Sequence, residues 1–155
     1  MIKYIESGDI FALPGVRCYA HGCNCAGAMG KGIALQFRHK YPEMYLEYKK
    51  RCKNGMFQLG DIFEYQQGDE HIYNLGTQKD WKTRATLDAI RESVWKMLES
   101  ATKQCITVIA IPKIGAGLGG LIWKDVKQML EEVILNFPNV TVIVVENYKQ
   151  VSEEE

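Results

Sequence analysis

The sequence has no excess of charge of either sign. Its 155 residues contain 19 Lys plus Arg and 19 Asp plus Glu, so the formal net charge at pH 7 is zero. Broad, nonspecific binding to nucleic acid needs an excess of Lys and Arg that displaces counterions from the phosphates, so we do not expect it here. The balance still allows a local basic pocket for one phosphorylated ligand.

Long apolar runs are absent as well. None approaches the roughly 20 residues that a helix needs to cross a bilayer, and the start, MIKYIESGDIF, lacks the charged and apolar regions of a signal peptide. The five cysteines are an odd number, and Cys18 and Cys105 lie in apolar runs, which is typical of reduced thiols. We therefore expect a soluble, cytoplasmic protein that has no membrane partner.

The chain also lacks internal repeats, low-complexity stretches and a recognisable linker, since its four prolines are scattered. Its length suits one domain. We predict a single domain over residues 1–150 and a disordered acidic tail over residues 151–155. No long heptad pattern indicates a coiled coil, so we expect a monomer.

Apolar patterning predicts alternating strands and helices. Residues 86–101 place their apolar side chains on one helical face, and residues 106–111 form a nearly continuous apolar run, typical of a strand buried on both faces. Such alternation indicates an α/β fold. The predicted strands cover residues 2–5, 16–20, 61–66, 72–75, 106–111 and 140–145, and the predicted helices cover residues 30–40, 86–101 and 123–136.

Two glycine-rich loops, residues 21–34 and 112–121, each join a strand to a helix. Glycine lets the backbone approach a ligand closely, and N–H groups at a helix start attract anions, so two facing loops would clamp a diphosphate. The alternative is that the glycines merely make turns. Neither loop matches a known nucleotide fingerprint: Gly32 follows Lys31 where a P-loop has Ser or Thr, and the Gly27-x-x-Gly30-x-Gly32 spacing fails the dinucleotide pattern.

Three motifs in order give the sequence a resemblance to the macrodomain family over about residues 1–148. They are Gly8-Asp9-Ile10, the stretch from Asn24 to Ala34, and Ile114-Gly115-Ala116-Gly117-Leu118. The sequence is most similar to the branch that contains the terminal ADP-ribose protein glycohydrolase, the DNA ADP-ribosyl glycohydrolase antitoxins and the yeast-type ADP-ribose 1″-phosphate phosphatase. The resemblance implies a three-layer α/β/α fold with a mixed, largely parallel central sheet.

The resemblance also implies that the partner is ADP-ribose, ADP-ribose 1″-phosphate or an ADP-ribosylated macromolecule, with no cofactor. Asp9 and the Ile10 backbone would contact adenine, Asn24 would bind the distal ribose, and Tyr148 would stack on adenine. Asp9 as a turn or capping carboxylate and Tyr148 as an ordinary surface tyrosine stay open. The phosphates would meet the two loops, at Gly30, Lys31, Gly32 and Ile33 and at Gly115, Ala116, Gly117, Leu118 and Gly119.

His21 is the leading catalytic candidate, because the phosphatase-like members carry a catalytic histidine at the mouth of the first loop. A histidine can donate or accept a proton at neutral pH. The alternative is a histidine merely hydrogen-bonded at a strand end. The spacing His21-x-Cys23-x-Cys25 lacks further metal ligands, so we expect no metal. The predicted activity is a metal-independent release of phosphate from ADP-ribose 1″-phosphate.

Two departures from the family pattern bear on the other activities. Gly119 stands where the protein glycohydrolase carries an aspartate. The antitoxins carry a Thr-Lys-Arg-His-Trp-like stretch, whereas this chain has Thr77-Gln78-Lys79-Asp80-Trp81, so their lysine is either displaced to Lys79 or replaced by Gln78. ADP-ribosyl hydrolysis on protein or DNA and non-catalytic ADP-ribose binding therefore rank as alternatives.

Overall fold

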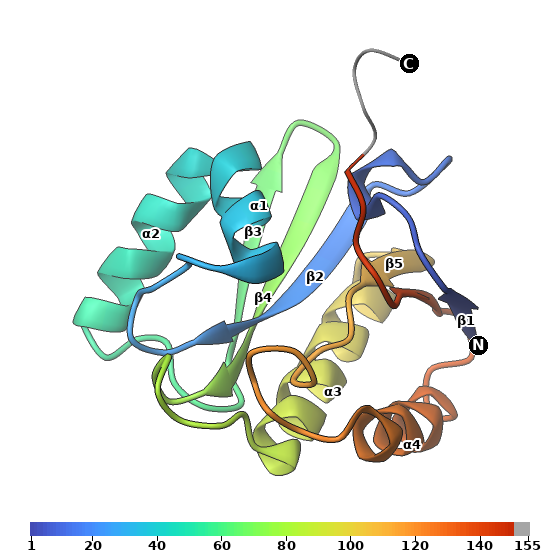
Figure 1. Ribbon diagram of the computed structural model, residues 1–155. Coiled ribbons are helices and arrows are strands. Elements are labelled where there is room, and N and C mark those ends of the chain that lie inside the picture. The colour runs from blue at the N-terminus through green and yellow to red at the C-terminus, as the bar shows by residue number, and fades with distance from the viewer. Residues whose placement is uncertain (151–155) are drawn as a thin grey trace.

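The computed structural model describes residues 1–150, and the predicted tail lies outside the described residues (Figure 1). The elements follow one another as β1 (Ile2–Ile5), η1 (Ile10–Ala12), β2 (Cys18–Asn24), α1 (Gly32–Lys40), α2 (Pro42–Lys53), β3 (Ile62–Gln67), β4 (Glu70–Gln78), α3 (Leu87–Lys103), β5 (Val108–Ile111), α4 (Trp123–Ile134) and β6 (Thr141–Val145). No helix within residues 1–150 is both long enough and apolar enough to span a bilayer.

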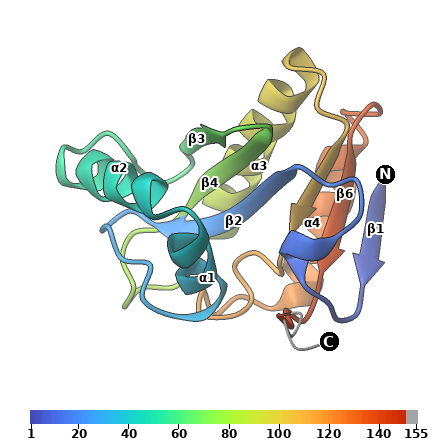
Figure 2. The ribbon, with the colours of Figure 1, turned by 90° about the horizontal axis from the view of Figure 1, so that it is seen from above.

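The strands form a six-stranded sheet in the order β1-β6-β5-β2-β4-β3. The β3–β4 pair is antiparallel and the other pairs are parallel, which confirms the mixed, largely parallel sheet. Figure 2 shows β1 and β3 at opposite edges, with β2 between them. A central parallel strand is covered on both faces, so its side chains are buried whichever way they point.

Two apolar cores, one on each face of the sheet, complete the three predicted layers. Alternate residues of a strand face opposite sides. Accordingly, Cys18 and Ala20 of β2 pack in the core beneath α3 and α4, whereas Tyr19 and Cys23 pack in the core beneath α1 and α2. Figure 1 shows these two helix pairs on opposite sides of the sheet.

The expected boundaries hold best where the apolar pattern is strongest. Strand β1 matches its prediction. Helix α1 ends at Lys40, and Pro42 begins α2 directly after the shared cap residue Tyr41. Helix α3 covers residues 87–103, with the Thr86 side chain accepting a hydrogen bond from the Ala89 N–H at 3.2 Å. The β3–β4 hairpin is present, and its turn contains Gly68 at a φ of 60°.

The predicted elements need two corrections: helix α2 was not among them, and the second strand lies later in the chain than expected. The prediction of a strand over residues 16–20 was wrong, because β2 runs from Cys18 to Asn24 and pairs with β4 along that length. The sequence pattern ends early because His21, Gly22 and Asn24 interrupt the apolar run. Pairing with β4 stabilises these residues as strand, so His21 lies inside β2 rather than at its end.

Candidate functional site

Asn24 organises the loop that follows β2. Its Oδ1 accepts hydrogen bonds from the backbone N–H groups of Ala26 (3.0 Å) and Ala28 (3.2 Å), and its Nδ2 donates to the Ala28 carbonyl (2.7 Å). The buried Tyr48 hydroxyl lies 2.7 Å from the Asn24 carbonyl and 2.9 Å from its Oδ1. A primary amide carries two N–H donors, so Asn24 can hold the loop and still offer one donor to a ligand.

The loop between β5 and α4 is closed by contacts between its own glycines. Gly115 has a φ of 77°, a conformation that favours glycine, and its carbonyl accepts a hydrogen bond from the Leu121 N–H at 2.9 Å. A Cβ on Gly119 would lie 2.6 Å from the Gly115 carbonyl oxygen. The position that carries an aspartate in the protein glycohydrolase therefore has no room for a side chain in this loop.

Residues of both loops line a cleft of about 350 Å³. A Cβ on Gly32 would lie 3.5 Å from Leu118 Cδ1, which shows how closely the loops approach each other. Four of the predicted ligand residues, Asn24, Gly30, Lys31 and Leu118, line the cleft; the predicted residues Gly32, Ile33, Gly115, Ala116, Gly117 and Gly119 do not. The lining consists of Gly22, Cys23, Asn24, Ala28, Gly30, Lys31, Ala34, Gln78, Trp81 and Leu118.

Two of the three predicted adenine residues line a second cavity of about 300 Å³. Asp9 and Tyr148 both line it, together with side chains from α1, and the Asp9 Oδ1 accepts a hydrogen bond from the Phe11 N–H at 2.9 Å. Asp9 is thus also the N-cap of η1. Burial and the nearby Asp9 charge raise the pKa of Tyr148 above its usual value. Ile10 is buried in the core beside this cavity and does not line it.

His21 lies in the core and does not line the cleft. Its side chain is 0% exposed, and its ring stacks on Phe37 with centroids 3.9 Å apart. Asn74 Nδ2 donates to the Phe63 carbonyl, which turns Asn74 Oδ1 toward His21 Nε2 at 2.7 Å and makes Nε2 the donor. Burial lowers the pKa of His21 to about 4, although the Asn74 hydrogen bond opposes the shift.

This placement corresponds to the alternative of a histidine held by a hydrogen bond. Cys23, two residues further along the strand, has its Sγ 3.5 Å from His21 Nε2 and lines the cleft. Burial raises the pKa of the Cys23 thiol well above its usual value, so the thiol is neutral at pH 7. Among residues 1–150, no three His, Cys, Asp or Glu side chains are grouped closely enough to hold a metal ion.

Gln78, rather than Lys79, lies at the cleft. Its Nε2 donates to the carbonyls of Asp80 (3.0 Å) and Thr83 (3.1 Å), which ties the end of β4 to the loop that follows. Lys79 is exposed and is not part of the lining. Of the two possibilities left open by the sequence, replacement of the lysine by Gln78 fits the structure.

The sequence reasoning missed Trp81 and Cys23 as cleft residues. Trp81 lies in a charged stretch that is typical of a solvent-exposed segment before a helix, and the sequence around Cys23 predicts a buried thiol. A signal was present for Trp81, because a tryptophan between Asp80 and Lys82 has no apolar neighbour in sequence to pack with.

Comparison with known proteins matches residues 20–130 to the model of the Macro domain family. The chain belongs to this family. The macrodomain is 36% identical over 148 residues to a DNA ADP-ribosyl glycohydrolase of Mycobacterium tuberculosis, covering 93% of this chain and 42% of that protein. This chain therefore spans about two fifths of the length of that relative.

Two shorter relatives match along most of their own length. The human ADP-ribose glycohydrolase OARD1 is 31% identical over 132 residues, covering 85% of this chain and 83% of the relative. An ADP-ribose 1″-phosphate phosphatase of Candida albicans is 31% identical over 146 residues, covering 85% and 93%. Among solved structures, the macrodomain of M. tuberculosis DarG superposes with a TM-score of 0.86 at 34% identity, covering 97% of this chain and 99% of that one.

Proposed function

We propose that this macrodomain binds ADP-ribose at the two cavities and hydrolyses the bond between the distal ribose and an acceptor in DNA. The observation that carries the proposal is the cleft itself. It brings Asn24, Lys31 and Gln78 together between two glycine-rich loops. Similarity to DNA ADP-ribosyl glycohydrolases over 93% of the chain supports the class of acceptor.

The helix ends beside the two loops support a diphosphate between them. Helices α1 and α4 follow the loops directly, and neither N-cap residue, Lys31 or Ile122, makes a side-chain capping hydrogen bond. By contrast, Thr86 caps α3. The first N–H groups of a helix need partners and carry partial positive charge, so uncapped ends at the two loops favour an anion there.

Lys31 is the residue that we assign to proton donation. Among the described residues that line the cleft, it carries the one cationic side chain, and the Cys23 thiol is neutral. Hydrolysis breaks the bond from C1″ to the acceptor, water supplies the new hydroxyl on C1″, and the acceptor leaves with the bonding electron pair and needs a proton. The Lys31 ammonium can supply that proton and then recover it from the attacking water.

A second candidate is phosphate release from ADP-ribose 1″-phosphate, with His21 as the catalytic group. It is supported by the similarity to the C. albicans phosphatase over 93% of that protein's length. This candidate requires the buried imidazole to reach the cleft past Cys23. Because burial also lowers the pKa of His21 to about 4, the imidazole is neutral at pH 7 and could accept a proton there but not donate one from a cationic form.

One set of incubations separates these candidates. The purified protein is mixed with an ADP-ribosylated single-stranded oligonucleotide, an ADP-ribosylated protein or ADP-ribose 1″-phosphate, while calorimetry measures ADP-ribose binding. We expect release of ADP-ribose from the oligonucleotide, and loss of that turnover in Lys31→Gln but not in Lys53→Gln, an exposed lysine at the end of α2. Phosphate release that depends on His21 would favour the second candidate, and binding without turnover would leave a non-catalytic ADP-ribose reader.

A further inference from the structure

Trp81 presents a large aromatic surface at the rim of the cleft. Its side chain is 65% exposed although it lines the same cleft as Asn24 and Gln78. Elsewhere in residues 1–150 the other two tryptophans are better covered: Trp95 packs edge-on against Phe137, and Trp123 donates a hydrogen bond to Glu146. An exposed indole at a binding cleft leaves apolar area that a ligand can cover.

The turn that carries Trp81 is held in place from both sides. The Asp80 carboxylate accepts hydrogen bonds from the backbone N–H groups of Lys82 (2.8 Å) and Thr83 (3.0 Å). Gln78 adds its two hydrogen bonds from the end of β4. Trp81 therefore projects from an ordered turn, which reduces the entropy lost when a flat ligand stacks on it.

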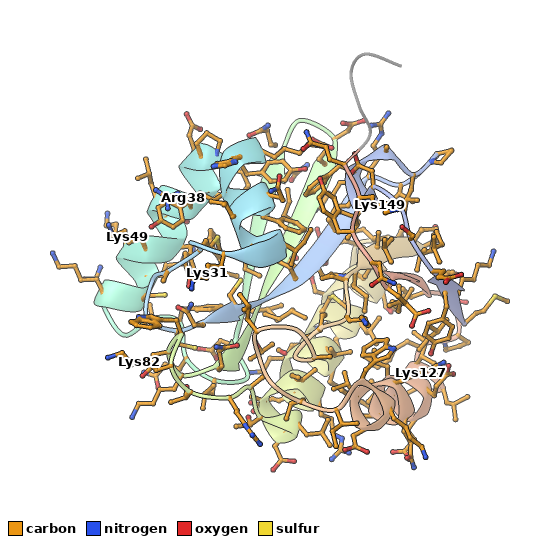
Figure 3. All side chains as sticks on the ribbon, in the orientation of Figure 1. Lys31, Arg38, Lys49, Lys82, Lys127 and Lys149 are labelled. Carbon is orange, nitrogen blue, oxygen red and sulfur yellow. The ribbon has the colours of Figure 1, made fainter. Side chains whose placement is uncertain are left out.

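The loop that carries the indole also carries three cationic side chains, one of which contacts the ring. Lys82 Nζ lies 4.9 Å from the centroid of the Trp81 ring, and Lys79 and Arg84 are exposed in the same loop. None of these three cations takes part in the ion pairs found among residues 1–150. Figure 3 shows Lys82 and Lys31 on the same side of the molecule, whereas Lys127 lies on α4, away from both.

We propose that Trp81 stacks on a base of single-stranded DNA beside the ADP-ribosylated nucleotide, while Lys82 and Lys79 contact the neighbouring phosphates. Aromatic rings interleaved with cations are the usual means of binding single strands, because every base has a flat face and every nucleotide a phosphate. A duplex would hide its bases within the stack, so the free strand is the fitting partner. This inference rests on the proposed function, and it makes Trp81 a substrate-positioning residue.

The test compares two substrates that differ only in the strand. Turnover is measured on an ADP-ribosylated single-stranded oligonucleotide and on the corresponding ADP-ribosylated mononucleoside. For Trp81→Ala we expect KM for the oligonucleotide to rise about tenfold more than KM for the mononucleoside, with kcat little changed, because stacking acts on the strand. Trp81→Phe keeps an aromatic ring, so its KM for the oligonucleotide should return most of the way to the wild-type value.

Lys82→Ala should weaken oligonucleotide binding and reduce the slope of log affinity against log salt by about 0.7, the value for one phosphate contact on a single strand. Its matched control is Lys127→Ala, since Lys127 Nζ lies 4.3 Å from the Tyr4 ring centroid on the far helix and should not affect this slope. Equal losses on both substrates in Trp81→Ala would overturn the inference, because Trp81 would then be only a wall of the ADP-ribose site.

A binding experiment keeps the inference separate from the proposed function. Quenching of tryptophan fluorescence by an unmodified single-stranded oligonucleotide is measured for the wild-type protein and for Trp81→Phe. Quenching that disappears in Trp81→Phe supports the stacking contact even if the wild-type protein turns over none of the ADP-ribosylated substrates, in which case only the proposed function fails. Unchanged quenching in Trp81→Phe, or none in the wild-type protein, overturns the inference.

Discussion

Replacing Gly119 by aspartate would restore the carboxylate of the protein glycohydrolase, and we expect it to destabilise the protein. The new Cβ would lie 2.6 Å from the Gly115 carbonyl oxygen and 2.9 Å from the Gly115 Cα, both of which are backbone atoms. Because backbone cannot rotate aside as a side chain does, the two halves of the loop must separate.

The size of the loss follows from the hydrogen bonds that hold those halves. The Leu121 N–H donates to the Gly115 carbonyl at 2.9 Å, and the Ala85 N–H donates to the Gly119 carbonyl at 2.8 Å. Each such bond contributes about 0.5–1.5 kcal/mol net, so weakening both lowers the free energy of unfolding by roughly 1–3 kcal/mol.

Urea unfolding followed by circular dichroism measures this loss as a lower midpoint at an unchanged m-value. Gly117→Asp is the matched control, because a Cβ at Gly117 meets nothing within 4 Å. We expect that variant to stay within about 0.5 kcal/mol of the wild-type protein. If Gly119→Asp were as stable as Gly117→Asp, the loop would be able to take up the side chain, and the steric account of the missing aspartate would be wrong.

Three further predictions concern the residues behind and around the cleft. Burial lowers the pKa of His21 from 6.5 to about 4, so the unfolded chain binds the proton first and stability falls as pH drops from about 6.5 to 4, by up to roughly 3 kcal/mol. Urea unfolding at several pH values should show this slope reduced in His21→Asn and retained in His39→Asn, since His39 is exposed. Tyr48→Phe removes the hydroxyl that contacts Asn24 and should cost about 1–2 kcal/mol of stability, with weaker ADP-ribose binding by calorimetry because the loop loosens. Asn24→Ala leaves two loop N–H groups without their acceptor and should weaken ADP-ribose binding more than Tyr48→Phe does; equal affinity in Asn24→Ala and the wild-type protein would count against Asn24 as a ligand residue.

Features that depend on residues close together in the chain were predictable from the sequence. The apolar face of α3 and the apolar run of β5 indicated the α/β layers, and the motifs around Asp9, Asn24 and Gly115 placed the loops at strand-to-helix transitions. These signals are local because helix and strand periodicity depend only on neighbours in the chain.

Features that depend on distant partners were not predictable. His21 lies in the core, where Asn74, 53 residues away, accepts its hydrogen bond. It lies inside a strand because β4 pairs with β2 as far as Asn24, the last residue of β2. Gly119 was expected to donate to phosphate, yet its packing against Gly115 fills the loop interior. Trp81 lies at the cleft because hydrogen bonds of Asp80 and Gln78 fix the turn that carries it, and these contacts are visible only in the folded chain.

The uncapped N-termini of α1 and α4 have a consequence for the dynamics of the protein. Helix α1 packs in one core through Phe37 and helix α4 packs in the other through Val126, so the two helices belong to opposite layers of the molecule. A single diphosphate that satisfied both ends would slow amide hydrogen exchange in the first turns of the two helices together. Ligand binding would then be detected as slower amide exchange on both faces of the sheet at once. The amides of α3, which Thr86 caps, would exchange at an unchanged rate.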